Sequence, residues 1–172
     1  RAEGADVTVV RTAALLHDIA AGKSGRDLHH TLGAEMAREI LTEMGHPADQ
    51  VEAVAHCIQA HRFRKPEEAP QTLEARCVFD ADKLDAIGAV GIARAFIYGA
   101  ELNQPMWGSV SPDFRAGIPT GEQHTAHHEF YHKLVHIRER LYTPTGRAIA
   151  AERHRFMADF YQRMAHEVAG ED

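Results

Sequence analysis

The sequence has 172 residues, of which 44% are hydrophobic and 26% are charged. This length and apolar content fit one folded domain and exclude a chain that is disordered throughout. The formal net charge of −6 argues against a partner that is a nucleic acid polymer, because proteins that bind such polymers usually present a basic face. We therefore expect a small-molecule partner.

The cysteine content and the hydropathy of the sequence indicate the cellular compartment that we expect for the protein. Cys57 and Cys77 are too few for a disulfide framework and lack the spacing of a zinc knuckle, so they predict free, buried thiols in a reducing cytoplasm. The longest apolar run, residues 86–100, is interrupted by Arg94 and is too short to cross a membrane. Because the chain begins at Arg1 rather than at Met, we expect the natural N-terminus to lie further upstream.

Helical periodicity dominates the first half of the chain, and no segment alternates apolar and polar residues as a strand would. Asp6 is the expected cap of a first helix that leads to His17. A second helix is expected to stop at Gly45. A third carries Val51 on its apolar face and ends in a basic cluster at residues 62–65.

The second half also predicts helices, separated by glycines and a long loop. We expect helices from Thr72 through Asp85, over residues 93–98, around residues 130–141, and from Thr143-Pro144 onward. Residues 99–122 predict a long loop, and loops of this length inside a domain are often functional. We expect this loop to line or cover the entrance for a substrate.

Thirteen histidines are the unusual feature of the composition, and histidine is the commonest metal ligand. His17-Asp18 ends the apolar face of the first helix. We expect both side chains to point inward, where a divalent cation would compensate for the buried carboxylate. Residues 128–132 fit the H-E-x-x-H pattern of zinc proteases, but no glycine-bounded third ligand follows, so we interpret them as a solvated polar helix face that is rich in histidine.

An acidic segment at residues 79–85 supplies further candidate ligands. On a helix, Asp82 and Asp85 lie on the same side as Val78. Asp80 lies about 200° from Asp82, because each residue turns the helix by about 100°. We therefore expect Asp82 and Asp85, but not Asp80, to face the interior.

These motifs together resemble the HD-domain superfamily of metal-dependent phosphohydrolases, most closely its small bacterial branch, which includes nucleotide pyrophosphohydrolases. The resemblance is carried by residues 13–19, 80–88, 91–96 and 129–134. It implies one all-α helical bundle over residues 1–172, with His17, Asp18 and Asp82 as metal ligands. It also implies a lone first histidine, which would lie on a helix upstream of residue 1.

The resemblance implies a divalent cation, with Mn²⁺ or Mg²⁺ favoured and Fe²⁺, Ni²⁺ or Zn²⁺ as alternatives. A metal-activated water would then attack phosphorus. We assign catalytic roles to Asp18, His61 and Asp85. The residues assigned to phosphate binding share a positive charge; they are Arg62, Lys65, Lys83, Arg94 and Lys133.

The predicted function is hydrolysis of a nucleoside triphosphate to the monophosphate and pyrophosphate. We expect no membrane partner. A homodimer stays open as an alternative to a monomer. Three other functions stay open. They are a phosphomonoesterase or other nucleotide hydrolase, a metal-binding scaffold or sensor without turnover, and a zinc protease at the His128 helix.

Overall fold

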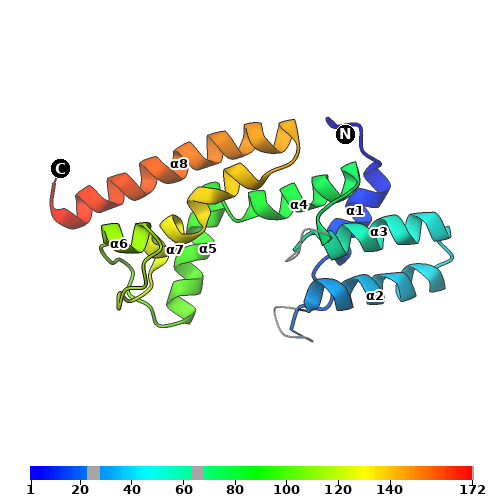
Figure 1. Cartoon of the computed structure of the whole chain (residues 1–172), viewed down its shortest axis with the longest axis horizontal. Coiled ribbons are helices and arrows are strands. Elements are labelled where there is room, and N and C mark those ends of the chain that lie inside the picture. Colours follow the sequence, from blue (N-terminus) through cyan, green and yellow to red (C-terminus); the bar gives the residue numbers. More distant parts are fainter. Residues whose placement is uncertain (23–27, 63–67, 172) are drawn as a thin grey trace. The chain divides into compact units, whose positions relative to one another are not determined.

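The computed structural model describes residues 1–22, 28–62 and 68–171. Every secondary-structure element in these ranges is a helix (Figure 1), which confirms the all-α prediction. The chain forms two compact units. Unit 1 comprises residues 1–82 and 142–146, and unit 2 comprises residues 83–141 and 147–172. No helix in the described ranges combines the length and apolar character that a membrane crossing requires.

Unit 1 contains α1 (Val7–Leu16), α2 (His29–Glu43), α3 (Ala48–Ala60) and most of α4 (Leu73–Asp85). Asp6 caps α1 as predicted, because its carboxylate accepts hydrogen bonds from the backbone N–H groups of Thr8 and Val9. Just beyond α2, Gly45 has a φ of 78°, a conformation that glycine adopts without strain. The predicted end of the second helix is therefore confirmed.

Side chains from all four helices form the core of unit 1. Its members are Val9, Ala13, Ala34, Ala37, Leu41, Val51, Val54, Ala55, Cys57, Ile58, Ala60, Ala75 and Val78. Many are alanines, which let helix backbones approach closely. Ile58 and Ala60 are buried in the last turn of α3. Their packing holds that turn, and therefore the next residue, His61, in place. Both cysteines are free thiols, and burial raises the pKa of Cys57 to about 12.

Unit 2 contains α5 (Gly88–Glu101), α6 (Pro112–Arg115), α7 (Ala126–His132), the 3₁₀ helix η2 (Leu134–Arg140) and most of α8 (Pro144–Ala169). Its core is rich in large side chains: Ile87, Ile92, Phe130, Leu134, Ile137, Leu141, Ala150, Met157 and Tyr161. Thr143 begins α8 as predicted, because its hydroxyl accepts a hydrogen bond from the N–H of Gly146 at 3.0 Å.

Two predictions for this half of the chain need correction. Residues 99–122 are not one continuous loop, because α5 runs on to Glu101 and α6 forms at Pro112–Arg115. The Ser111 hydroxyl caps α6 by accepting a hydrogen bond from Phe114 N. The helix expected around residues 130–141 is two elements, since Lys133, with φ −134° and ψ −52°, leaves the helical conformation between α7 and η2.

Candidate metal centre

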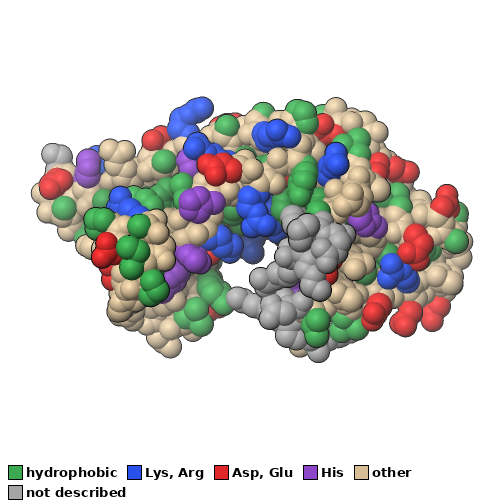
Figure 2. Space-filling view, in the orientation of Figure 1, with side chains coloured by type: hydrophobic (Ala, Val, Ile, Leu, Met, Phe, Trp, Pro, Cys, Tyr) green, Lys and Arg blue, Asp and Glu red, His purple; other side chains and the backbone are tan. Residues whose placement is uncertain are grey.

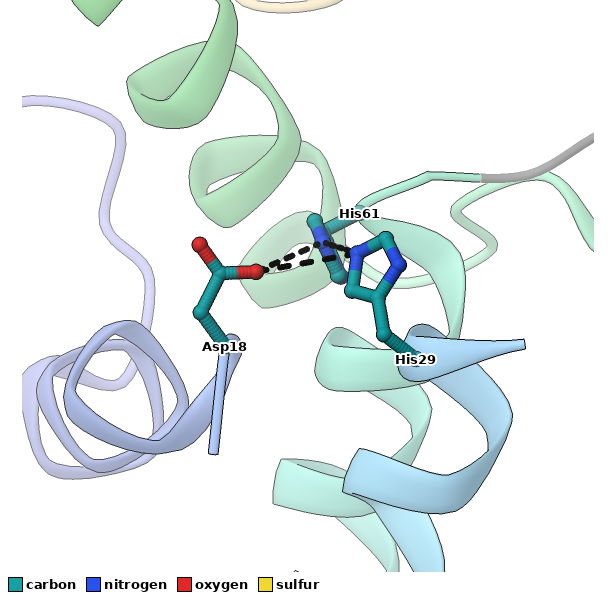
Figure 3. A group of neighbouring side chains, drawn as sticks. All are labelled: Asp18, His29 and His61. Atoms are coloured by element: carbon teal, nitrogen blue, oxygen red, sulfur yellow. Dashed lines mark hydrogen bonds and ion pairs between the residues drawn. The ribbon is translucent and has the colours of Figure 1, made fainter. Parts of the chain in front are cut away.

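Three side chains from different helix ends converge in unit 1 (Figure 3). Asp18 lies in the turn after α1, His29 is the first residue of α2, and His61 caps the C-terminal end of α3. The Nε2 atoms of His29 and His61 are 3.3 Å apart. Asp18 Oδ1 lies 3.6 Å from the first and 3.9 Å from the second. One oxygen and two nitrogens, the donor types that divalent metals use, thus lie close together.

The size of this triangle fits a metal ion. The circle through three atoms separated by 3.3, 3.6 and 3.9 Å has a radius of about 2.1 Å. Typical Zn–N and Mg–O bonds have about this length. The C-terminal ends of α1 and α3 also favour a cation here, because the unpaired carbonyls of a helix end carry partial negative charge.

Backbone contacts orient the imidazole rings for metal binding. The Nδ1 atom of His61 donates to the carbonyl of Ile58 at 2.5 Å, and Nδ1 of His17 donates to that of Ala14 at 2.9 Å. Because a carbonyl only accepts hydrogen bonds, Nδ1 carries the proton and the neutral ring keeps its lone pair on Nε2. His17 Nε2 lies 3.3 Å from Asp18 Oδ2, so Asp18 presents one oxygen to His17 and the other to His29 and His61.

The site is buried on its histidine side and open on its carboxylate side. The side chains of His61 and His29 are 3% and 9% exposed, whereas that of Asp18 is 56% exposed. The expectation that His17 and Asp18 both point into the interior is therefore wrong for Asp18, and His17 is only partly buried. The reason is that α1 ends at Leu16, so this pair lies in the turn beyond the packed helix face.

The three aspartates of α4 do not divide as predicted. Asp82 is half-buried, but Asp85 is exposed and pairs with Arg94. Asp80, expected to face away from the interior, is 2% exposed and binds the backbone of Tyr142 and Thr143. A helical wheel compares directions within one helix only, and it does not reveal that residues 142–146 cover the second face of α4.

The cations assigned to phosphate binding are spread over the two units. Arg62, half-buried, directly follows His61 in unit 1, and Lys65 lies outside the described residues. Lys83 is half-buried in unit 2. Also in unit 2, Arg94 pairs with Asp85, and Lys133 Nζ lies 3.1 Å from Glu129 Oε1. A phosphate at either of these last two cations would compete with a carboxylate.

The H-E-x-x-H motif has a structural role. His128 is 1% exposed; its Nε2 lies 3.0 Å from Glu122 Oε2, and its Nδ1 lies 2.8 Å from the hydroxyl of Thr125. His127 is buried as well, so the interpretation as a solvated face is wrong. Since both nitrogens of His128 already have protein partners, the motif offers no ready zinc site, and the protease alternative loses its support.

His29 is the candidate ligand that the sequence analysis missed. A signal was present, because His29-His30 begins the second helix and only a short loop separates it from His17-Asp18. A short connection brings the end of one helix close to the start of the next. The sequence analysis gave His61 a catalytic role and did not count it among the metal ligands. In the structure its Nε2 lies close enough to the ligand atoms of Asp18 and His29 to bind the same metal ion.

Comparison with known proteins identifies the family. The HD domain model matches residues 1–87. YpgQ of Bacillus subtilis is 33% identical over 173 aligned residues, which cover 99% of this chain and 77% of YpgQ. Ribonuclease Y of Chloroflexus aurantiacus is 41% identical over 83 residues, 47% of this chain and 14% of that enzyme. The chain belongs to the HD domain family.

Solved structures agree with this assignment. The crystal structure of B. subtilis YpgQ in complex with ADP has a TM-score of 0.76 at 32% identity, covering 99% of this chain and 82% of that one. An HD-superfamily hydrolase from Bacillus thuringiensis has a TM-score of 0.71 at 28% identity, covering 98% and 77%. The predicted resemblance is confirmed, and the chain is a hydrolase of the HD superfamily, a family of metal-dependent phosphohydrolases.

Proposed function

We propose that this protein is a divalent-metal-dependent phosphohydrolase that acts on a nucleotide, with a nucleoside triphosphate as the first candidate substrate. The observation that carries the proposal is the convergence of Asp18 Oδ1 with the Nε2 atoms of His29 and His61. The exposed side of Asp18 leaves room for a phosphoryl group to reach a cation held there.

Two further observations support a small nucleotide over a polymer. YpgQ, which resembles this chain over 99% of its length, has been crystallised with ADP. In unit 1, acidic side chains gather over the α2–α3 end of the surface (Figure 2). The exposed members are Glu35, Glu39, Glu43, Asp49 and Glu52. Such a surface repels the phosphates of a long nucleic acid.

Each residue of the centre has a proposed task. Asp18, His29 and His61 hold a cation, and the family resemblance adds His17 and Asp82 as ligands. The mixed nitrogen and oxygen donors suit Mn²⁺, Mg²⁺ or Fe²⁺. When bound, such a cation supplies Lewis acidity and lowers the pKa of its water. The carbonyls of Ala14 and Ile58 keep two of the rings in the metal-binding tautomer. We assign Arg62 to binding the phosphate.

The first experiment identifies the reaction. The protein is incubated with Mn²⁺ and a panel of nucleoside mono-, di- and triphosphates, and the released products are separated. We expect pyrophosphate from a triphosphate. Release of orthophosphate would replace this reaction with a phosphomonoesterase or another nucleotide hydrolase. Tight Mn²⁺ binding without any product would favour a metal-binding scaffold or sensor.

The second experiment tests the residues. Asp18→Asn, His29→Ala and His61→Ala should each lower turnover by more than about 100-fold, because loss of a direct ligand exceeds the effect of losing an outer partner. His46→Gln is the matched control, since His46 lies in unit 1 and its ring bonds only the side chain of Gln50 among the contacts described. Equal losses in the control and in the three ligand variants would contradict the assignment.

A further inference from the structure

Asp80 is a buried carboxylate that joins two distant segments of unit 1. Its Oδ1 accepts a hydrogen bond from Tyr142 N at 2.9 Å. Its Oδ2 accepts two more, from Thr143 N and from the Thr143 hydroxyl, each at 2.7 Å. The side chains of Asp80 and Thr143 are both buried. This clamp therefore connects α4 to the first residues of α8 across about sixty positions of the chain.

Gly146 completes the clamp. Its N–H donates to the Thr143 hydroxyl, which in turn donates to Asp80, so the three groups form one chain of hydrogen bonds. A Cβ atom at residue 146 would lie 2.5 Å from Asp80 Oδ2 and 2.8 Å from Thr143 Oγ1. Contacts this short are not tolerated, so the clamp closes only because residue 146 has no side chain.

The clamp is also a directional constraint on α4 that lies two residues from Asp82. The buried residues of α4 are Ala75, Val78, Phe79 and Asp80. The first three make apolar contacts, which are largely indifferent to direction. Hydrogen bonds to a carboxylate depend on angle and fix the rotation of the helix. Asp80 precedes Asp82 by two residues on a rigid backbone, so the two side chains rotate together.

We propose that Asp80 is a positioning residue that sets the rotation of α4 and thereby aims Asp82 at the metal centre. The proposal rests on the proposed function, in which Asp82 is a ligand. The effect is large enough to matter, because a functional side chain has to be held within about 0.5 Å and 10–20° of its working geometry. We expect the loss of this anchor to allow a rotation of that size.

The test measures Mn²⁺ affinity by calorimetric titration of the whole chain. Asp80→Asn, which loses one carboxylate acceptor, and Gly146→Ala, which displaces the carboxylate, should each weaken Mn²⁺ binding by about ten-fold or more. Thr143→Val should weaken it less, and Thr143→Ser, which keeps the hydroxyl, should bind as the wild type does. Met157→Ala is the control, because it removes a fully buried side chain in the core of unit 2.

Two comparisons separate positioning from a merely structural role. Met157→Ala should lower the melting temperature and leave Mn²⁺ affinity unchanged. If Asp80 acts through Asp82, adding Asp80→Asn to Asp82→Asn should cause no further loss of affinity. Wild-type affinity in Asp80→Asn and Gly146→Ala, or additive losses in the double variant, would overturn the proposal. If Asp80→Asn does not fold, Thr143→Val decides by the same criteria.

Failure of the proposed function has a different signature. If the wild type binds Mn²⁺ but hydrolyses no phosphate ester, the hydrolase proposal fails, and the affinities still decide the role of Asp80. If the wild type binds no Mn²⁺, both proposals are overturned.

Discussion

Each unit contains a group of neighbouring histidines, and among the residues that the structure describes only the group in unit 1 resembles a metal centre. In unit 1, His29 and His61 direct Nε2 atoms at one carboxylate oxygen. In unit 2, three neighbouring histidines each have a partner of their own. His124 contacts Glu129, His127 contacts the carbonyl of Gly108, and His128 contacts Glu122 and Thr125. Convergence of lone pairs, rather than the number or spacing of histidines, distinguishes a candidate ligand set.

Aromatic packing is a second difference between the histidines of unit 2 and those of the candidate metal centre. The His127 ring is stacked on Trp107 with centroids 3.9 Å apart, and it also stacks on Tyr161. Phe114 of α6 lies within 6.4 Å, centroid to centroid, of His124, His128 and His132, so a phenyl ring lies near all three of these histidines. These four histidines of unit 2 therefore pack against aromatic rings, and the hydrogen bonds of His127 and His128 attach the segment before α7.

The largest expected difference between the clusters is their response to metal. At a free Mn²⁺ concentration of 100 times Kd, binding should stabilise the folded protein by about 2.7 kcal/mol. His128→Ala should keep this gain, because His128 lies outside the proposed centre, and His61→Ala should lose it. Urea unfolding with Mn²⁺ and with EDTA measures the gain in each variant. A gain that survives in His61→Ala and disappears in His128→Ala would reverse the assignment of the two clusters.

Without metal, substitutions of the histidines in unit 2 should lower the free energy of unfolding more, the more deeply the histidine is buried. His128→Ala should lower the free energy of unfolding by about 1–3 kcal/mol, because it removes a buried ring and leaves its polar partners without it. His124→Ala, at a side chain that is 39% exposed, should cost no more than about 1 kcal/mol. Urea unfolding in EDTA measures both. A larger loss at His124 would show that burial does not determine the contribution of these histidines.

The smallest expected effect is a pH dependence at His127. Burial lowers the pKa of His127 below its ordinary value. The hydrogen bond to the Gly108 carbonyl raises this pKa, and the charges of Arg115 and His128 lower it. The net change is a lower pKa. The folded state thus favours the neutral ring. The neutral His127 ring therefore stabilises the folded state above about pH 6.5, which is the pKa of histidine in the unfolded chain. This stabilisation is lost as the pH falls below that value, because the unfolded state then binds a proton that the folded state does not.

Trp107, the single tryptophan, reports this effect through its emission during unfolding. Between pH 7.5 and pH 5.5, the wild type should lose more stability than His127→Phe, which keeps a stacking ring but does not titrate. Equal losses in the two proteins would mean that His127 is not the group responsible. The proposed role of residues 99–122 as a cover for the substrate entrance stays a prediction, which a change in Trp107 emission on adding nucleotide would support.

Family resemblance and helical periodicity together predicted part of the candidate site. They identified His17-Asp18 as the central pair and placed His61 nearby, but they missed His29. They also assigned Asp80 to the wrong environment, since the segment that covers it begins 62 residues later. Asp82 and the expected upstream histidine stay predictions from the resemblance, and so does the description of residues 1–172 as one domain.

The sequence by itself determined the helices and several of their ends, because caps depend on groups three or four residues apart. Asp6 before α1, Gly45 after α2 and Thr143-Pro144 at the start of α8 are such local signals. Only the tertiary structure decided which polar side chains meet. His29 and His61 are 32 residues apart, and Asp80 and Thr143 are 63 apart. Helical periodicity carries no information over such separations, because the packing of whole helices brings these residues together.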